Sequence, residues 1–542
     1  MNFSDSRQWL WLPMAMLLIA AAVLTRPAMP VDETRYLSVA WEMWRSGDFL
    51  VPHSNGLPYS HKPPLLFWLI NFGWWLLGEQ EWSARLTGPL CGVAALFLTR
   101  LLAGDLFPRT RSVQLATPYI LLGMLCWSFF ASLTMFDTLM SCMALSGYLA
   151  AYRGATGRLQ HWWLPMGLAI GGGVLAKGPI ILVYTVPALL LAPWWARPLQ
   201  VSAWRWYGQV MLAIAVGGLV ALSWALPAAW AGGREYGDPL LFGQTAGRMV
   251  KAFDHQRPFY FYLLVLPAML FPWSVWPAIW RGLFSSPPGD AGRRFLLAIL
   301  LPGLVILSLV SAKQIHYMLP LLPAAAILIA AAIDKIAEEQ PLDRVVLLIV
   351  WGLVTLAVAA LPLLPIRGSS ARFISQLPVW LGLCPLAAFL PFIVARGEHH
   401  RHLTPLRTAV ATTLFFIGIH LGLSTPLNAN YRIANISRAL AGMAARHQTV
   451  AVYPRKLDDQ FHFTGRLVAP VVPLRSAQEV IDQTITAPES GIVINLKEPT
   501  IPKMPAGIIA EPYKGGWLLL VLPQPQRDGA IAATLASILQ RG

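Results

Sequence analysis

Long apolar runs separated by short polar segments recur along most of this 542-residue chain. A helix needs about 20 apolar residues to cross the hydrocarbon core of a bilayer, and about thirteen runs approach that length. Only 12% of the residues are charged, whereas ordinary globular chains carry about 25%. A soluble protein could not keep so apolar a surface in water. The sequence therefore predicts an α-helical polytopic membrane protein.

The expected spans are 9–28, 84–103, 113–131, 133–152, 162–176, 178–194, 208–230, 259–281, 295–312, 318–333, 344–362, 378–395 and 406–424. The run Pro64–Gly78 is too short to cross, and we expect an interfacial or re-entrant helix there. With that run outside and a cytoplasmic N-terminus, most Lys and Arg residues of the short loops are cytoplasmic. A cleaved signal peptide is the alternative for the first run, but its apolar length favours a retained helix.

The chain changes character after about residue 424, where strand and helix patterns replace the long apolar runs. Thr449–Pro454, Gly491–Leu496 and Gly516–Pro523 are short apolar runs typical of buried strands. Ile433–Arg446 and Asp528–Gln540 have the spacing of amphipathic helices. An odd number of spans puts this part outside, where we expect the periplasm. The expected domains are a membrane domain over 1–424 and a small periplasmic α/β domain over 425–542.

The net charge of +15 does not indicate nucleic-acid binding, because an excess of Lys and Arg is typical of membrane proteins. Two external loops, 25–85 and 231–258, are unusual because they are both long and basic. Their basic residues include Arg35, Lys62, Arg248 and Arg257. Arg and Lys commonly bind phosphate oxygens. The sequence thus predicts a phosphate-bearing ligand at the outer face.

Polar residues from distant segments are expected near the same outer plane: Asp32, Glu33, Asp137, Lys177, His316 and Tyr317. Charged groups at membrane depth are costly and usually face a cavity. Taken singly, the acids could end helices in water and the lysine could lie in an exposed turn. The tyrosine could belong to the interfacial aromatic belt, and the arginines of the second loop could be solvated. Their common depth favours one site.

Three motifs stand in the first external loop: Asp32-Glu33-Thr34-Arg35-Tyr36, Gly47-Asp48-Phe49 and Tyr59-Ser60-His61-Lys62-Pro63-Pro64. This loop resembles that of the C-type membrane glycosyltransferases, which use polyprenyl-phosphate sugars and include protein O-mannosyltransferases. Ala176-Lys177-Gly178 and Ser311-Ala312-Lys313 fit further stretches of the class. Within it, the chain most resembles the lipid A 4-amino-4-deoxy-L-arabinose transferase family. His61 and Gln244 depart from the pattern, because related enzymes often have acids there.

The resemblance implies a C-type fold over the whole chain and a transferase in the bacterial inner membrane. The donor would be undecaprenyl phosphate carrying aminoarabinose, and the acceptor a phosphate of lipid A, a modification linked to polymyxin resistance. Asp32 and Asp137 match the two acidic catalytic positions. The resemblance assigns donor-phosphate binding to Tyr59, Lys62, Arg248 and Tyr317, and support of the loop or substrate to Glu33, Arg35, Lys177 and Arg257. No cofactor is required for a pre-activated donor, and a divalent cation is compatible with the acids but not demanded by their spacing.

The acceptor determines what Asp32 would do. A phosphate monoester is largely a dianion near pH 7, so Asp32 would orient it or bind the amine of the sugar, and one displacement would invert the anomeric centre. The first alternative is another lipid-sugar transferase such as a protein O-mannosyltransferase, whose hydroxyl acceptor needs a general base. The second is a lipid flippase or transporter, although the sequence has no paired halves or broken helices typical of transporters.

Overall fold

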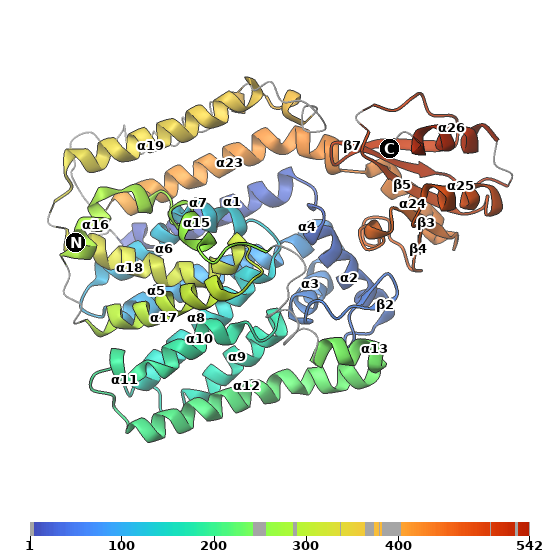
Figure 1. The fold of residues 1–542 in the computed structure, drawn as a ribbon. Helices are drawn as coiled ribbons and strands as arrows, with labels where there is room; N and C mark the ends of the chain where they lie inside the picture. The colour runs from blue at the N-terminus through green and yellow to red at the C-terminus, as the bar shows by residue number, and fades with distance from the viewer. Residues whose placement is uncertain are drawn as a thin grey trace.

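The computed structural model of this chain describes residues 5–241, 256–285, 290–336, 338–363, 373–378, 380–381, 403–498, 500–525 and 529–540. Long helices lie side by side through most of the molecule, and a β-sheet domain lies at one end of them (Figure 1). Among the described residues, seven helical stretches have the length and apolar composition to cross a membrane: Arg7–Thr25, Glu81–Leu106, Ala203–Ala231, Ala291–Leu309, Ile315–Lys335, Pro341–Ala360 and Thr404–Tyr431. The helical membrane architecture is confirmed, whereas the expected count of about thirteen spans is not.

The main helices of these seven stretches are α1 (Trp11–Thr25), α5 (Thr87–Leu106), α12 (Ala203–Ala231), α17 (Ala291–Leu309), α18 (Leu322–Lys335), α19 (Pro341–Ala360) and α23 (Thr404–Tyr431). Two further expected spans are the unbroken helices α8 (Phe136–Ala155) and α9 (Trp163–Lys177). Three more are interrupted, as α6 (Arg111–Gly123) with α7 (Leu125–Phe130), α10 (Ile181–Leu190) with α11 (Ala192–Trp195), and α15 (Phe261–Met269) with α16 (Pro277–Phe284). The run 378–395 lies almost entirely outside the described residues.

The interruption between α6 and α7 shows why an apolar run need not be one helix. Met124 is extended, with φ −74° and ψ 119°. The N–H of Leu125 then donates to the carbonyl of Phe271, 3.1 Å away, in the break between α15 and α16. Two breaks therefore satisfy backbone groups between them, as a bilayer requires. Hydropathy carries no trace of this pairing, so the sequence predicted continuous spans.

The first external loop folds into helices around a small hairpin. α2 (Asp32–Ser46) ends at Gly47, which has a φ of 72°. Strands β1 (His53–Ser54) and β2 (Leu57–Pro58) pair antiparallel across the turn Asn55-Gly56, whose positive φ values suit a two-residue hairpin. α3 (Leu65–Leu77) is a 13-residue helix in the predicted short apolar run, and α4 (Glu81–Arg85) follows it. Placement of α3 in the membrane interface stays a prediction.

The C-terminal domain contains a five-stranded mixed sheet in the order β4-β3-β5-β7-β6. The predicted strands are β3 (Val450–Tyr453), β5 (Gly491–Leu496) and β7 (Gly516–Val521); β4 (Val472–Pro473) and β6 (Ile508–Tyr513) complete the sheet. β3 runs parallel to β5, and β7 runs antiparallel to both β5 and β6. Alternate side chains of these strands pack against α24 (Ala434–Ala445) and against α25 (Ala477–Thr486) with α26 (Gly529–Leu539). Because α23 continues to Tyr431, the sheet domain begins after that residue.

The sheet domain contacts the first external loop directly. The indole N–H of Trp41 in α2 donates to the carbonyl of Leu467 at 2.9 Å. The side chain of Asn55 in the hairpin bonds both backbone groups of Val471, at 3.0 and 2.6 Å. Phe463 stacks on Trp74 of α3, with ring centroids 5.1 Å apart. Polar and aromatic contacts therefore hold the domain against α2 and α3.

Candidate active site

A cavity of about 360 Å³ lies where α2, the segment before α3, the start of α8, the end of α9 and η4 (Ile315–Leu321) meet. Its lining comprises Asp32, Arg35, Tyr36, Tyr59, His61, Lys62, Met135, Phe136, Asp137, Lys177, Gln314, His316 and Tyr317. The lining contains two carboxylates, three cationic side chains and three tyrosines. Groups of this kind can bind a phosphate and a polar sugar together.

The inner wall of the cavity is built from the facing ends of two neighbouring helices. Asp137 lies in the first turn of α8 and Lys177 in the last turn of α9, where the helix dipoles favour these charges. The Nζ of Lys177 lies 2.6 Å from Oδ1 of Asp137 and 4.6 Å from the centroid of the Tyr317 ring. Asp137 is 2% exposed, so its carboxylate does not reach bulk water and is balanced inside the cavity. His316 Nε2 lies 4.0 Å from Oδ2 of the same acid.

The opposite wall comes from the first external loop. Asp32 begins α2 and is exposed, and Tyr36 one turn later donates its hydroxyl to Oδ1 of Asp32 at 3.4 Å. Tyr59 is buried and its ring lies 5.3 Å from that of His61. The Nζ of Lys62 lies 5.7 Å from the centroid of the Phe136 ring. An exposed acid and a buried, lysine-paired acid thus line the same cavity.

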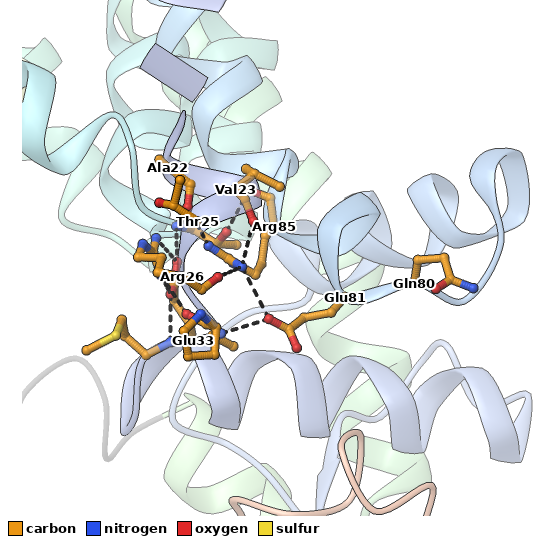
Figure 2. Close-up of polar contacts among 12 residues, drawn as sticks. Ala22, Val23, Thr25, Arg26, Glu33, Gln80, Glu81 and Arg85 are labelled. Atoms are coloured by element: carbon orange, nitrogen blue, oxygen red, sulfur yellow. Dashed lines mark hydrogen bonds and ion pairs between the residues drawn. The ribbon is translucent and has the colours of Figure 1, made fainter. Parts of the chain in front are cut away.

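Glu33 does not line the cavity but lies behind it in a buried ionic network (Figure 2). Its Oε1 accepts from Arg26 Nη2 at 3.0 Å and from the N–H of Thr134 at 2.9 Å. Its Oε2 accepts from Arg26 Nη1 and from the N–H of Met29, the latter at 2.8 Å. Arg85 adds bonds to carbonyls at the end of α1. The network therefore ties the segment before Asp32 to the turn before Asp137.

Burial and the neighbouring charges of this network shift the pKa of Glu33 in opposite directions. Burial alone would raise the pKa, but the charge and hydrogen bonds of Arg26 lower it, with help from Arg85 and the Thr134 N–H. The net pKa is about 2. Glu33 is therefore an ion at every physiological pH, and a buried ion of this kind is tolerated only because all its oxygens are bound.

A glycine brings α5 close to the same turn. A Cβ at Gly88 would lie 2.5 Å from the carbonyl of Leu133 and 2.7 Å from the Cα of Thr134, so no larger residue fits without a backbone shift. The hydroxyl of Thr138 also donates to the carbonyl of Gly88 at 3.0 Å. This close approach fixes the start of α8, and with it Asp137.

Eight of the residues predicted to form a site meet in the cavity: Asp32, Arg35, Tyr59, Lys62, Asp137, Lys177, His316 and Tyr317. Arg257 is exposed and outside the cavity lining, with its guanidinium 5.7 Å from the Phe261 ring. Arg248 and most of the expected loop 231–258 lie outside the described residues. Sequence reasoning missed Tyr36 and Gln314, although the helical spacing of Tyr36 from Asp32 is a usable signal.

In the described part of the chain, no group of three or more His, Cys, Asp or Glu residues could hold a metal ion.

Comparison with solved structures identifies the fold. The fold matches the crystal structure of ArnT from Cupriavidus metallidurans bound to undecaprenyl phosphate, with a TM-score of 0.73, 19% identity, and 95% and 98% of the two chains covered. This likeness confirms the C-type membrane glycosyltransferase fold. The family model of dolichyl-phosphate-mannose-protein mannosyltransferases matches residues 61–224.

Proteins with similar sequences share one enzyme name. The undecaprenyl phosphate-alpha-4-amino-4-deoxy-L-arabinose arabinosyl transferase of Pectobacterium atrosepticum is 30% identical over 368 residues, which are 66% of this chain and 62% of the relative. The enzyme of the same name from Pseudomonas paraeruginosa is 33% identical over 351 residues, 62% and 61% of the two chains. The chain thus spans less than two thirds of the length of these curated relatives. The chain is therefore similar in sequence to undecaprenyl phosphate-aminoarabinose arabinosyl transferases and similar in fold to the ArnT structure.

Proposed function

We propose that this protein transfers 4-amino-4-deoxy-L-arabinose from undecaprenyl phosphate to a phosphate of lipid A. The cavity carries the proposal, because it gathers acids, cations and tyrosines from five distant segments at one end of the helices. The names of the relatives support the donor. The reaction belongs at the periplasmic face of the bacterial inner membrane, with the N-terminus cytoplasmic and the sheet domain periplasmic.

In this proposal, each wall of the cavity has a task. Lys62, Tyr59 and Tyr317 bind the donor phosphate, and with Arg248 they balance its charge as the sugar leaves. Fixed cations in a water-poor site stabilise developing phosphate charge without reorganisation. Asp32, exposed at the start of α2, orients the acceptor phosphate or binds the amine of the sugar. The acceptor oxygen attacks C1 as the C1–O bond to the donor phosphate breaks, which inverts the anomeric centre and leaves undecaprenyl phosphate.

Asp137 has a different role because Lys177 already neutralises it. The pair lies 2.6 Å apart with both side chains largely buried, so Asp137 is poorly placed to act as a base. We propose that it holds Lys177 beside Tyr317, at the position where the donor phosphate lies. A salt bridge in the wall of the cavity can orient a ligand through its lysine.

The test uses a Gram-negative host that makes the aminoarabinose donor but lacks its transferase. Mass spectrometry of lipid A is expected to show aminoarabinose on a phosphate when this chain is expressed. Asp32→Asn is expected to abolish the product. Asp238→Asn, the same charge change at an exposed external position outside the cavity, is expected to retain it. Unmodified lipid A, with folded protein in the membrane and donor present, would contradict the proposal.

The second candidate is transfer of a sugar to a protein hydroxyl. The family model of protein mannosyltransferases over residues 61–224 favours it. Here Asp32 would take the hydroxyl proton as a general base. Glycopeptide mass spectrometry of envelope proteins from the same cells separates the two reactions, because only this candidate adds a sugar to peptide.

A further inference from the structure

The sheet domain reaches the wall of the cavity through two consecutive residues. Asp459 and Gln460 follow the short helix η7 (Arg455–Leu457) and contact the first turn of α2. Oδ2 of Asp459 accepts the Nε–H of Arg35 in an ion pair. Oε1 of Gln460 accepts the hydroxyl of Thr34. Two neighbouring residues of α2 therefore bind two neighbouring residues of the sheet domain, and the paired contacts fix how the two segments are aligned.

The contact is also braced within the sheet domain. Gln460 is 1% exposed, and its Nε2 donates to Oδ1 of Asp459. Both oxygens of Asp459 are thus bound, one by its neighbour and one by Arg35. The Asp459 side chain is 14% exposed and does not line the cavity, whereas Arg35 does. Any effect of Asp459 on a bound substrate must therefore pass through Arg35.

We propose that Asp459, braced by Gln460, is a positioning residue that holds the Arg35 guanidinium at the cavity for an anionic oxygen of a phosphate-bearing substrate. The guanidinium has five N–H donors, and Asp459 occupies the Nε–H. Within the described part of the chain, the terminal nitrogens of Arg35 make no hydrogen bond. A guanidinium with its plane fixed presents these groups to phosphate oxygens in a two-point geometry.

Docking of the sheet domain does not by itself explain this contact. Trp41 with Leu467, and Asn55 with Val471, already join the domain to the external loop. Phe463 adds aromatic packing against α3. The domain therefore stays docked when Asp459 loses its charge, and a loss of transfer can be separated from a loss of folding.

The kinetic test rests on the proposed function and compares Asp459→Asn with Asp458→Asn in the full-length protein in detergent. Asp458 provides the same charge change one residue away, and no ion pair joins it to Arg35 in the described structure. Asp459→Asn is expected to lower kcat/KM about tenfold, the effect of losing one charge-assisted hydrogen bond. Asp459→Glu restores part of the loss, and Asp458→Asn changes kcat/KM less than twofold. The thermal midpoints of Asp459→Asn and Asp458→Asn agree.

Two substrates could supply the phosphate, and the same kinetics distinguish them. A higher KM for the undecaprenyl donor assigns Arg35 to the donor phosphate, whereas a higher KM for lipid A assigns it to the acceptor phosphate. Equal transfer by Asp459→Asn and Asp458→Asn would overturn the inference. So would a loss of transfer that only follows a loss of folded protein.

A second measurement needs no substrate and so separates this inference from the proposed function. Phenylglyoxal modifies accessible guanidinium groups, and peptide mass spectrometry reports the rate at Arg35. Loss of the Asp459 ion pair is expected to raise that rate several-fold, while Asp458→Asn leaves it unchanged. If the wild type transfers no aminoarabinose but this difference holds, the proposed reaction is wrong and the positioning of Arg35 stands. An unchanged rate in Asp459→Asn overturns the positioning whatever the substrate.

Discussion

Glu33→Gln gives the sharpest test of how the cavity is held in place. The substitution keeps the volume of the side chain but replaces one carboxylate oxygen with an NH₂ group. Each oxygen of Glu33 accepts from one Arg26 nitrogen and from one backbone N–H, that of Thr134 or Met29. The new NH₂ therefore faces two donors in either orientation, and Arg26 keeps its charge without a counter-ion. No rotamer of glutamine satisfies the site.

Two independent arguments give the size of the loss. Removing one partner of a buried ion pair typically costs about 3 to 5 kcal/mol. The pKa of Glu33 is lowered from an ordinary 4.5 to about 2, which corresponds to about 3 kcal/mol of stability at neutral pH. Because the folded pKa is the lower one, this contribution is complete above about pH 4.5 and is lost as the pH falls towards 2. We expect Glu33→Gln to lower the free energy of unfolding by about 3 kcal/mol.

The assay is reversible unfolding in mixed detergent micelles, followed by tryptophan fluorescence at pH 7 and pH 4. Glu81→Gln is the control, because the Glu81 side chain is 36% exposed and only its Oε1 accepts hydrogen bonds, from Arg85 Nη1 and the Ala28 N–H, which the amide oxygen of glutamine can still accept. The wild type is expected to lose part of its advantage over Glu33→Gln at pH 4. Equal stabilities of Glu33→Gln and Glu81→Gln at pH 7 would refute the reasoning.

Four further outcomes are expected. Lys62→Ala should weaken binding of undecaprenyl phosphate in a thermal-shift titration much more than it lowers the free energy of unfolding; equal losses would indicate a structural role. Lys177→Met leaves Asp137 as an unpaired buried charge and should destabilise the protein by about 3 kcal/mol, whereas Asp137→Asn combined with it should restore part of that loss. Arg257→Ala, at an exposed position outside the cavity, should alter transfer less than Lys62→Ala, and a larger effect would place Arg257 in the site. Burial lowers the pKa of His462 to about 4, so protonation of the unfolded chain destabilises the fold as the pH drops from 6.5 to 4, and His462→Gln should flatten the pH dependence of stability over that range.

The hydrophobic pattern of the sequence predicted the central strands of the sheet better than its edge strands. β3, β5 and β7 are apolar on both faces because they form the centre of the sheet, and their runs stand out in the sequence. β6 forms one edge and carries Glu511 and Pro512, so its pattern is weak. The break at Met124 is invisible for a different reason, because its backbone partner Phe271 lies far along the chain.

The site shows the same division between local and distant signals. Asp32, Asp137 and Lys177 stand out in the sequence because charge is rare beside apolar runs and helix ends gather at one level. Asp459 lies 424 residues from Arg35 in a polar segment where another acid is ordinary. Nothing in its local sequence distinguishes it from Asp458. The contribution of the sheet domain to the cavity could therefore be found only from the fold.

The helix α3 connects the wall of the cavity to an exposed apolar surface. On one side, its buried Phe67 packs 5.7 Å from Phe136 and 6.3 Å from Tyr59, both of which line the cavity. On the other side, Phe72 and Trp75 are 56% and 69% exposed. A helix of 13 residues is only about 20 Å long, so it is suited to lie in the headgroup layer and is too short to span the bilayer. At the predicted interfacial position, lateral pressure of the lipid would act on α3 and, through Phe67, on Phe136 and Tyr59 in the cavity wall.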